Sequence, residues 1–134
     1  MTLRLPVSVG QSIERLSARL GHKPAQLGAR LVEEGVRRRE FPLIDFRETA
    51  SGRVAYLRGT RFAVYWIVQA ARRLKGNLEK TAKTRDLPLD KVHAALHYAE
   101  SFPEEIESDI AHAEANRASL AKAELSLKKA KARG

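Results

Sequence analysis

The sequence contains no cysteine among its 134 residues. This absence excludes a disulfide framework, a thiol nucleophile and any zinc site built from cysteine. No apolar run approaches the length of a membrane span, and the first residues are too polar for a signal peptide. We therefore expect a cytoplasmic protein that has no membrane partner.

Residue patterns typical of enzymes and metal sites are also lacking. His93 and His97 stand four residues apart, a spacing that can hold a metal on a helix. However, Ala94 stands where that motif has its glutamate, and no third ligand lies nearby in the sequence. No serine, lysine or pair of carboxylates has a recognisable catalytic spacing. We expect a protein that is not an enzyme and that uses no metal or cofactor.

Positive charge is abundant, with 25 Lys and Arg residues against 16 Asp and Glu residues and a net charge of +9. This excess favours a polyanionic partner, most simply nucleic acid. A solvated basic surface without a partner is the alternative. Residues 1–40 carry +4 and residues 41–103 carry +5, whereas residues 104–134 are neutral overall. The three charge characters predict three segments with these boundaries.

The first residues, Thr2 to Pro6, have the pattern of one short strand. Leu3 and Leu5 point to one side and Thr2 and Arg4 to the other, because side chains alternate along a strand. The backbone of such a strand needs a partner, and helical sequence follows it, so we expect the same strand from a second copy of the chain. A two-stranded ribbon of this kind fits the major groove of DNA. An exposed edge strand with ordinary polar residues is the alternative.

Two helices are expected after this strand. Ser8 and Gln11 have the spacing of a capping box, which predicts the start of the first helix, and Gly21 predicts its end. Pro24 suits the first position of the second helix, which closes on three arginines at residues 37–39. Forty residues are too few to bury an adequate core alone, which again favours an oligomer.

The order of Thr2–Pro6, a helix ending at Gly21 and a helix opening near Pro24 resembles a ribbon-helix-helix DNA-binding domain of the CopG/Arc type. The resemblance implies an intertwined homodimer in which Thr2 and Arg4 read base edges of double-stranded operator DNA. It also implies a phosphate contact near Lys23, at the N-terminus of the second helix. Lys23 and Pro24 stand where the family usually has a capping Ser or Thr.

Residues 41–103 predict a small mixed domain. Residues 41–47 and 54–57 are strand candidates that form a short β-hairpin, and a turn at Gly59 follows them. Helical periodicity then covers residues 64–74, 78–85 and 90–101, with Asp90 as the expected cap of the last helix. The last two helices have the proportions of a helix-turn-helix. Lys91 and His93, early in its second helix, can contact DNA, although this pair of helices can equally be structural.

Single residues of this domain leave alternatives open. Arg58 and Arg61 flank the Gly59-Thr60 turn and can hold a phosphate or carboxylate, or can be ordinary surface charges. Trp66 can anchor an interface, but its helical spacing from apolar neighbours is more typical of a core residue.

Four stretches of this domain are similar to the VapB-type antitoxin-like family: residues 41–47, 57–61, 92–98 and 102–106. The family pattern combines a Gly-Thr-Arg turn, a helix-turn-helix, an Ala-Leu-x-Tyr helix and a Pro-x-Glu-Ile end. The resemblance implies a bacterial toxin–antitoxin partner protein, often encoded beside a PIN-like ribonuclease toxin.

Residues 104–134 form a tail rich in good helix formers, with a thin apolar face and a basic end. Such a helix is marginal in water and often becomes ordered on a partner. PIN-type ribonucleases hold metal with acidic residues, so we expect the toxin to be contacted by basic residues of the tail: Arg117, Lys122, Lys128, Lys129 and Arg133. A solvated helix or frayed terminus is the alternative.

Together these patterns predict a mainly α protein with short β segments: a ribbon-helix-helix, then a helix-turn-helix domain with a β-hairpin, then a helical tail. The leading hypothesis is a type II antitoxin that represses its own operon through the N-terminal β-ribbon and neutralises a PIN-like toxin protein. The alternative is a stand-alone bacterial transcriptional regulator without a toxin, whose later domain serves dimer or tetramer assembly.

Overall fold

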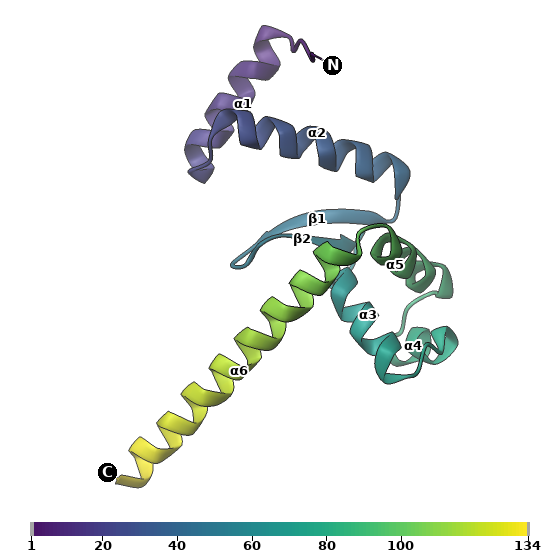
Figure 1. Ribbon diagram of the computed structural model, residues 1–134, viewed down its shortest axis with the longest axis vertical. Coiled ribbons are helices and arrows are strands. Elements are labelled where there is room, and N and C mark those ends of the chain that lie inside the picture. Colours follow the sequence, from purple (N-terminus) through teal and green to yellow (C-terminus); the bar gives the residue numbers. More distant parts are fainter. Residues whose placement is uncertain (1, 134) are drawn as a thin grey trace. The chain divides into compact units, whose positions relative to one another are not determined.

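The computed structural model describes residues 2–133 and is mainly helical (Figure 1). The chain divides into two compact units, residues 1–40 and 41–134. Over the described residues there is one two-stranded antiparallel hairpin, and it follows the two N-terminal helices. No helix within this part of the chain combines the length and the apolar character needed to cross a membrane.

The first unit contains helix α1 (Val7–Leu20) and helix α2 (Pro24–Glu40). Gly21 ends α1 as expected, because its φ of 69° lies in the left-handed region that glycine adopts without steric cost. The expected capping box at Ser8 is wrong. The helix begins earlier, since the carbonyl of Pro6 accepts hydrogen bonds from the amides of Val9 and Gly10 at 3.0 and 3.1 Å.

Residues 2–6 lie outside any strand in the single chain. The expected N-terminal strand is therefore not formed by one copy alone, since a strand needs a neighbour to pair with.

The helices α1 and α2 contact each other closely at Gly28 of α2. A Cβ added at this glycine would lie 3.7 Å from Cδ1 of Ile13 in α1.

The second unit opens with strands β1 (Ile44–Thr49) and β2 (Gly52–Leu57). They pair antiparallel, with Ile44 opposite Leu57 at one end and Thr49 opposite Gly52 at the turn. The turn is fastened by the Thr49 side chain, which donates to the Gly52 carbonyl at 2.7 Å and accepts from the Ser51 amide at 3.2 Å. The hairpin is thus built by local sequence.

Three helices follow the hairpin: α3 (Val64–Arg73), α4 (Leu78–Arg85) and α5 (Leu89–Ser101). Asn77 caps α4, because its side chain accepts a hydrogen bond from the Lys80 amide at 3.0 Å. Asp90 does not cap α5, contrary to expectation. It lies inside the helix, which begins after Pro88 without any side-chain cap.

The core of the second unit is centred on α5. Val92, Ala95 and Tyr98 of this helix are fully buried. The Tyr98 ring contacts the rings of Phe41, Phe46 and Phe102, with centroids 4.8 to 6.2 Å apart. The Tyr98 hydroxyl donates to Glu105 at 2.6 Å, which ties α5 to the helix that follows. The core thus joins the hairpin to α5 and its successor.

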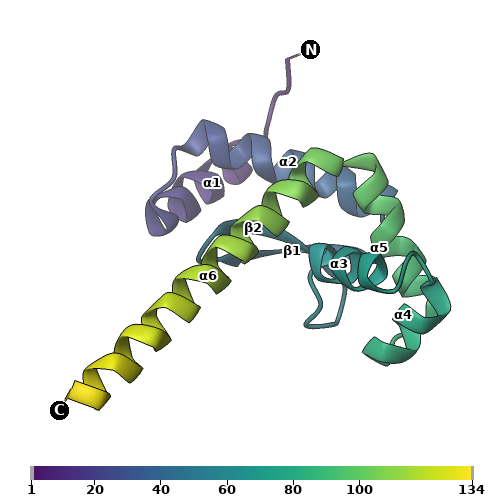
Figure 2. The same ribbon diagram turned by 60° about the horizontal axis from the view of Figure 1, so that its bottom comes forward.

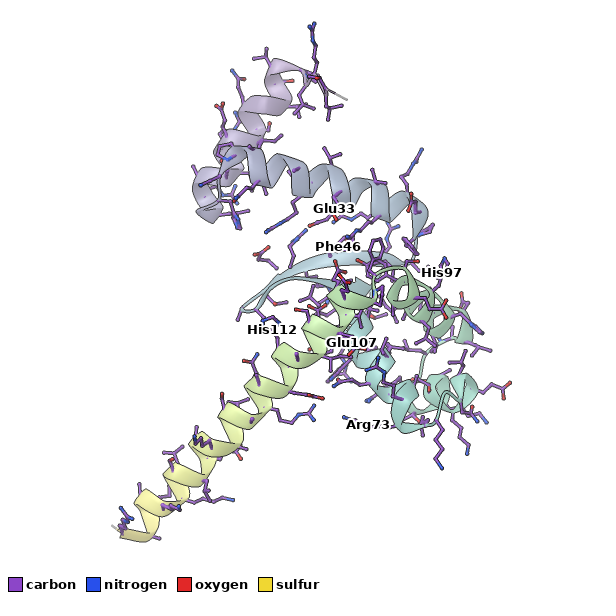
Figure 3. All side chains as sticks on the ribbon, viewed as in Figure 1. Glu33, Phe46, Arg73, His97, Glu107 and His112 are labelled. Carbon is purple, nitrogen blue, oxygen red and sulfur yellow. The ribbon has the colours of Figure 1, made fainter. Side chains whose placement is uncertain are left out.

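The last helix, α6 (Pro103–Arg133), is continuous (Figures 1 and 2). Its first turns belong to the core, because Ile106 and Ile110 are buried. Glu107, labelled in Figure 3, forms an ion pair with Arg72 of α3. We expected the apolar face of the tail to be too thin to pack on the rest of the chain. This expectation is wrong for the first turns of α6, where Ile106 and Ile110 are buried. It holds for residues 114–133, which are exposed.

Candidate nucleic-acid interface and partner surfaces

The side chains expected to read DNA bases, Thr2 and Arg4, are both exposed. The alternating residues Leu3 and Leu5 line an apolar groove of about 610 Å³ together with residues of both helices, among them Ile13, Pro24 and Val32. The two faces of this segment therefore differ as a strand's faces do: one carries polar side chains, and the other borders an apolar surface.

A second groove of about 430 Å³ lies beside the first and shares Leu5, Ile13 and Val32 with it. Several large apolar side chains of this unit are strongly exposed: Leu3, Leu5, Val7, Val9, Leu20, Val32 and Val36. These large apolar side chains of a forty-residue unit are thus in contact with water. Exposed apolar patches of this kind mark interaction surfaces.

Lys23 is exposed and immediately precedes α2. Its carbonyl accepts the Leu27 amide at 3.0 Å, so it belongs to the first turn of the helix. Amide groups of a first helical turn that lack an acceptor favour an anion. This position suits a backbone phosphate, and the lysine adds a positive charge to it.

Lys91 and His93 lie in the first turns of α5, in the second unit. His93 is exposed, whereas Lys91 is half-buried. The opposite face of α5 forms the core. Lys91 and His93 thus belong to the second unit, whereas Thr2 and Arg4 belong to the first. His97, the other histidine of α5, packs its ring 5.2 Å from that of Phe41.

The five cations expected to contact a toxin are all exposed on α6. At roughly 100° per residue they fall within one half of the helix surface. Leu120 and Leu127 are about 65% and 63% exposed and lie on the other side of the helix. One side of the exposed part of α6 thus carries five cations with Leu125 among them, and the other side carries Leu120 and Leu127 beside Lys131. Nothing in the described chain covers either side.

Trp66 is 40% exposed, so the core interpretation of this residue is wrong. The centroid of the Trp66 ring lies 5.8 Å from that of the Phe62 ring. The Arg85 guanidinium carbon lies 5.6 Å from the same Trp66 centroid. Arg58 and Arg61 are both exposed beside the Gly59-Thr60 turn. The turn itself is held by the Thr60 hydroxyl, which donates to the Leu57 carbonyl at 2.8 Å.

A polar pocket of about 180 Å³, which we call the turn pocket, had no signal in the sequence. It is lined by the hairpin turn, by β2, by α3 and by α6: Thr49, Ala50, Ser51, Val54, Tyr56, Tyr65, Asp109, His112, Ala113 and Asn116. The Asn116 amide donates to the Ser51 hydroxyl at 3.4 Å, so α6 and the hairpin turn meet across it. His112 is labelled on α6 in Figure 3.

Asp109 and Tyr65 are the electrostatically perturbed groups of the turn pocket. Burial raises the pKa of Asp109 to about 6, the negative charge of Glu105 adds to this effect, and His112 opposes it. Burial also raises the pKa of Tyr65, with further contributions from Tyr56 and Asp109. Both shifts mean that negative charge is disfavoured here unless a cation accompanies it.

Comparisons of this chain with known protein families, with curated proteins and with solved structures find no match. The two resemblances noted from the sequence therefore depend on the residues quoted for them.

Proposed function

We propose that this chain is a homodimeric DNA-binding protein that acts as the antitoxin of a type II toxin–antitoxin system. In this proposal the paired N-terminal segments bind operator DNA, and the exposed part of α6 captures a PIN-like ribonuclease toxin. The observation that carries the DNA-binding half is the first unit: an unpaired segment with alternating faces that borders an uncovered apolar groove.

A second copy of the chain is the occupant that this surface fits. Pairing residues 2–6 of two copies about a two-fold axis would satisfy their backbone groups and place Leu3 and Leu5 of both chains over the apolar grooves. The same pairing would leave Thr2 and Arg4 of both chains on the outer face. A ribbon with this width can enter the major groove.

The toxin-binding half is supported by the exposed half of α6. Its basic side suits the acidic metal-binding cluster of a PIN-like ribonuclease, and Leu120 and Leu127 add apolar contacts. The stand-alone regulator is the competing function. The stand-alone regulator would bind DNA, and no partner protein would need residues 118–133 of the chain in order to bind it.

DNA binding is tested by fluorescence anisotropy with the DNA upstream of the chain's own gene and with a scrambled fragment. A dimer with about six to ten phosphate contacts should lose roughly three to five decades of affinity between 50 and 200 mM salt. Thr2→Ala/Arg4→Ala should lose the preference for the operator and keep much of the salt-dependent background. Arg39→Ala, which removes an exposed charge elsewhere in the same unit, is the matched control.

If the double variant keeps its operator preference, the ribbon does not read the DNA sequence, and Lys91 and His93 on α5 become the residues to replace.

Toxin capture is tested separately by co-purification with the nuclease encoded beside the gene. A chain ending at Arg117 should keep DNA binding and lose the nuclease. Full neutralisation by this shortened chain would overturn the toxin-binding half and favour the stand-alone regulator.

A further inference from the structure

The turn pocket joins segments about sixty residues apart in the chain. The hairpin turn supplies Thr49 and Ser51, and one face of α6 supplies Asp109, His112 and Asn116, at steps of three and four residues. Tyr65 of α3 closes another side. Because the pocket unites three separate parts of the fold, it is fixed in shape as firmly as the unit itself.

The polar groups around the turn pocket are unequally satisfied. Thr49 is bonded within the turn, Ser51 accepts from Asn116, and one ring nitrogen of His112 lies 2.9 Å from the Ser108 carbonyl. The Asp109 Oδ2 atom, in contrast, is shielded from water and has no hydrogen-bond partner in the described chain. A buried carboxylate oxygen without a donor is costly, and it leaves the negative charge of Asp109 poorly compensated. A cation that binds the accessible side of this carboxylate would therefore gain more here than at the surface.

The charged groups around the turn pocket determine whether a positively or a negatively charged ligand is favoured. Of the described residues that line the turn pocket, none is Lys or Arg, although the chain carries a net charge of +9. The charged or titratable groups that act on Asp109 and Tyr65 are Glu105 and His112 on α6, Tyr56 of the hairpin, and Arg117, which directly follows Asn116 of the pocket lining. Glu105 and the two tyrosine rings favour a cation, whereas Arg117, and His112 when it is protonated, oppose one.

We propose that the turn pocket binds a single guanidinium or primary ammonium group, whose N–H groups donate to the Asp109 carboxylate and whose positive charge lies against the ring of Tyr65. The volume of about 180 Å³ admits such a head group, which has about the size of two or three water molecules. The ligand can be a free small cation or the arginine or lysine side chain of a protein partner. This site includes no residue of the proposed DNA-binding ribbon and none of residues 118–133 of α6.

The proposal is tested with the full chain by NMR titration, following ring signals of Tyr65 and His112. N-acetyl-arginine amide is the probe, and N-acetyl-citrulline amide is its uncharged counterpart of nearly equal shape. Saturable shifts are expected at pH 7.5 with the arginine compound, and binding at least tenfold weaker with the citrulline compound. Equal binding of the two compounds would overturn the proposal.

Asp109→Asn should weaken arginine binding at least tenfold, whereas Glu114→Gln should leave it unchanged. Glu114 is an exposed carboxylate of the same helix and does not line the turn pocket, so both variants change the net charge equally. Wild-type affinity should also fall tenfold or more between pH 7.5 and pH 4.5, because a neutral Asp109 no longer attracts a cation. Similar losses in both variants, or affinity unchanged at pH 4.5, would contradict the assignment.

Two further probes distinguish a free small cation from the side chain of a protein partner: methylguanidinium, and a short peptide with one arginine among alanines. Tighter binding of the peptide indicates a partner's side chain, and equal binding indicates a free small cation. Failure of both probes to shift the Tyr65 and His112 rings would overturn the proposal. None of these outcomes depends on DNA or toxin binding, so they are distinct from a failure of the proposed function.

Discussion

Asp109 shows how a single carboxyl group links the packing of α6 to pH. Its folded-state pKa of about 6 lies above the ordinary value of 3.8, mainly because of burial. The folded state therefore binds a proton more readily than the unfolded state does. The stabilisation that this proton gives is complete below the ordinary pKa and is lost as pH rises through 6.

Asp109→Asn should consequently raise the free energy of unfolding at pH 7.5 by about 1 kcal/mol, a value discounted because the group is only partly buried. At pH 4 the variant and the wild type should be nearly equal, since both side chains are then neutral. Urea unfolding at the two pH values measures the difference, with Glu114→Gln as control. A gain of equal size at both pH values would show that packing, and not charge, is responsible.

The hydrogen bond between Tyr98 and Glu105 is a second interaction of single residues that should affect stability. The Tyr98 side chain is fully buried, and its hydroxyl donates to the Glu105 carboxylate at 2.6 Å. Tyr98→Phe keeps the aromatic packing and should lower the free energy of unfolding by roughly 1.5–3 kcal/mol, because it removes a hydrogen bond to a charged acceptor. Thermal unfolding followed by circular dichroism measures the change. Tyr56→Phe, at a half-buried tyrosine of the hairpin, is the control, and an equal effect there would contradict this explanation.

At the scale of elements, local signals predicted most boundaries. Gly21 and Pro24 placed the end of α1 and the start of α2, because each residue acts on the backbone next to it. The cap that Asn77 provides for α4 was not predicted, although the range 78–85 was. The two cap predictions that failed, Ser8 and Asp90, follow prolines whose carbonyls already accept the first helical bonds.

The turn pocket and the exposed Trp66 could not be predicted in the same way. Both depend on how α3 and α6 rest against the hairpin, and the pairing of distant segments leaves no periodic trace in one sequence. Asp109 stands in an acidic run and looks like a solvated residue. The alternation along Thr2–Pro6, in contrast, is itself a local pattern, and the prediction that this segment reads DNA depends on that pattern.

The helix α6 should respond differently to shortening at two positions. A chain ending at Arg117 loses only exposed residues, so its thermal midpoint should match that of the full chain within about 2 °C. A chain ending at Glu105 also loses Ile106 and Ile110 from the core and should unfold or melt at least about 10 °C lower. Unchanged stability of the shorter chain would contradict the packing of α6 on this unit.

At the scale of the whole molecule, the two units differ in how they are stabilised. Residues 41–134 have a core of their own, whereas residues 1–40 leave apolar side chains uncovered and, in our proposal, depend on a second copy. Stability that depends on association varies with protein concentration, and stability within one chain does not.

Urea unfolding of the full chain should therefore show two transitions, and only the one belonging to residues 1–40 should move to higher urea as protein concentration rises. Ile13→Asp, which places a charge in both apolar grooves, should abolish the concentration-dependent transition and reduce the mass measured by light scattering to that of a monomer. Ala18→Asp, at an exposed position of the same helix outside both grooves, is the control. A dimer that persists in the Ile13 variant would exclude this surface as the interface.

On the proposed function, the exposed end of α6 would also affect how long the protein survives in a cell. Residues 118–133 are covered by nothing in the described chain, and an isolated helix of this length opens readily. It also carries lysines and arginines at short intervals, which offer cleavage points to trypsin-like proteases. Molecules without a partner would be degraded first, so the lifetime of this chain would report whether the partner that binds α6 is present.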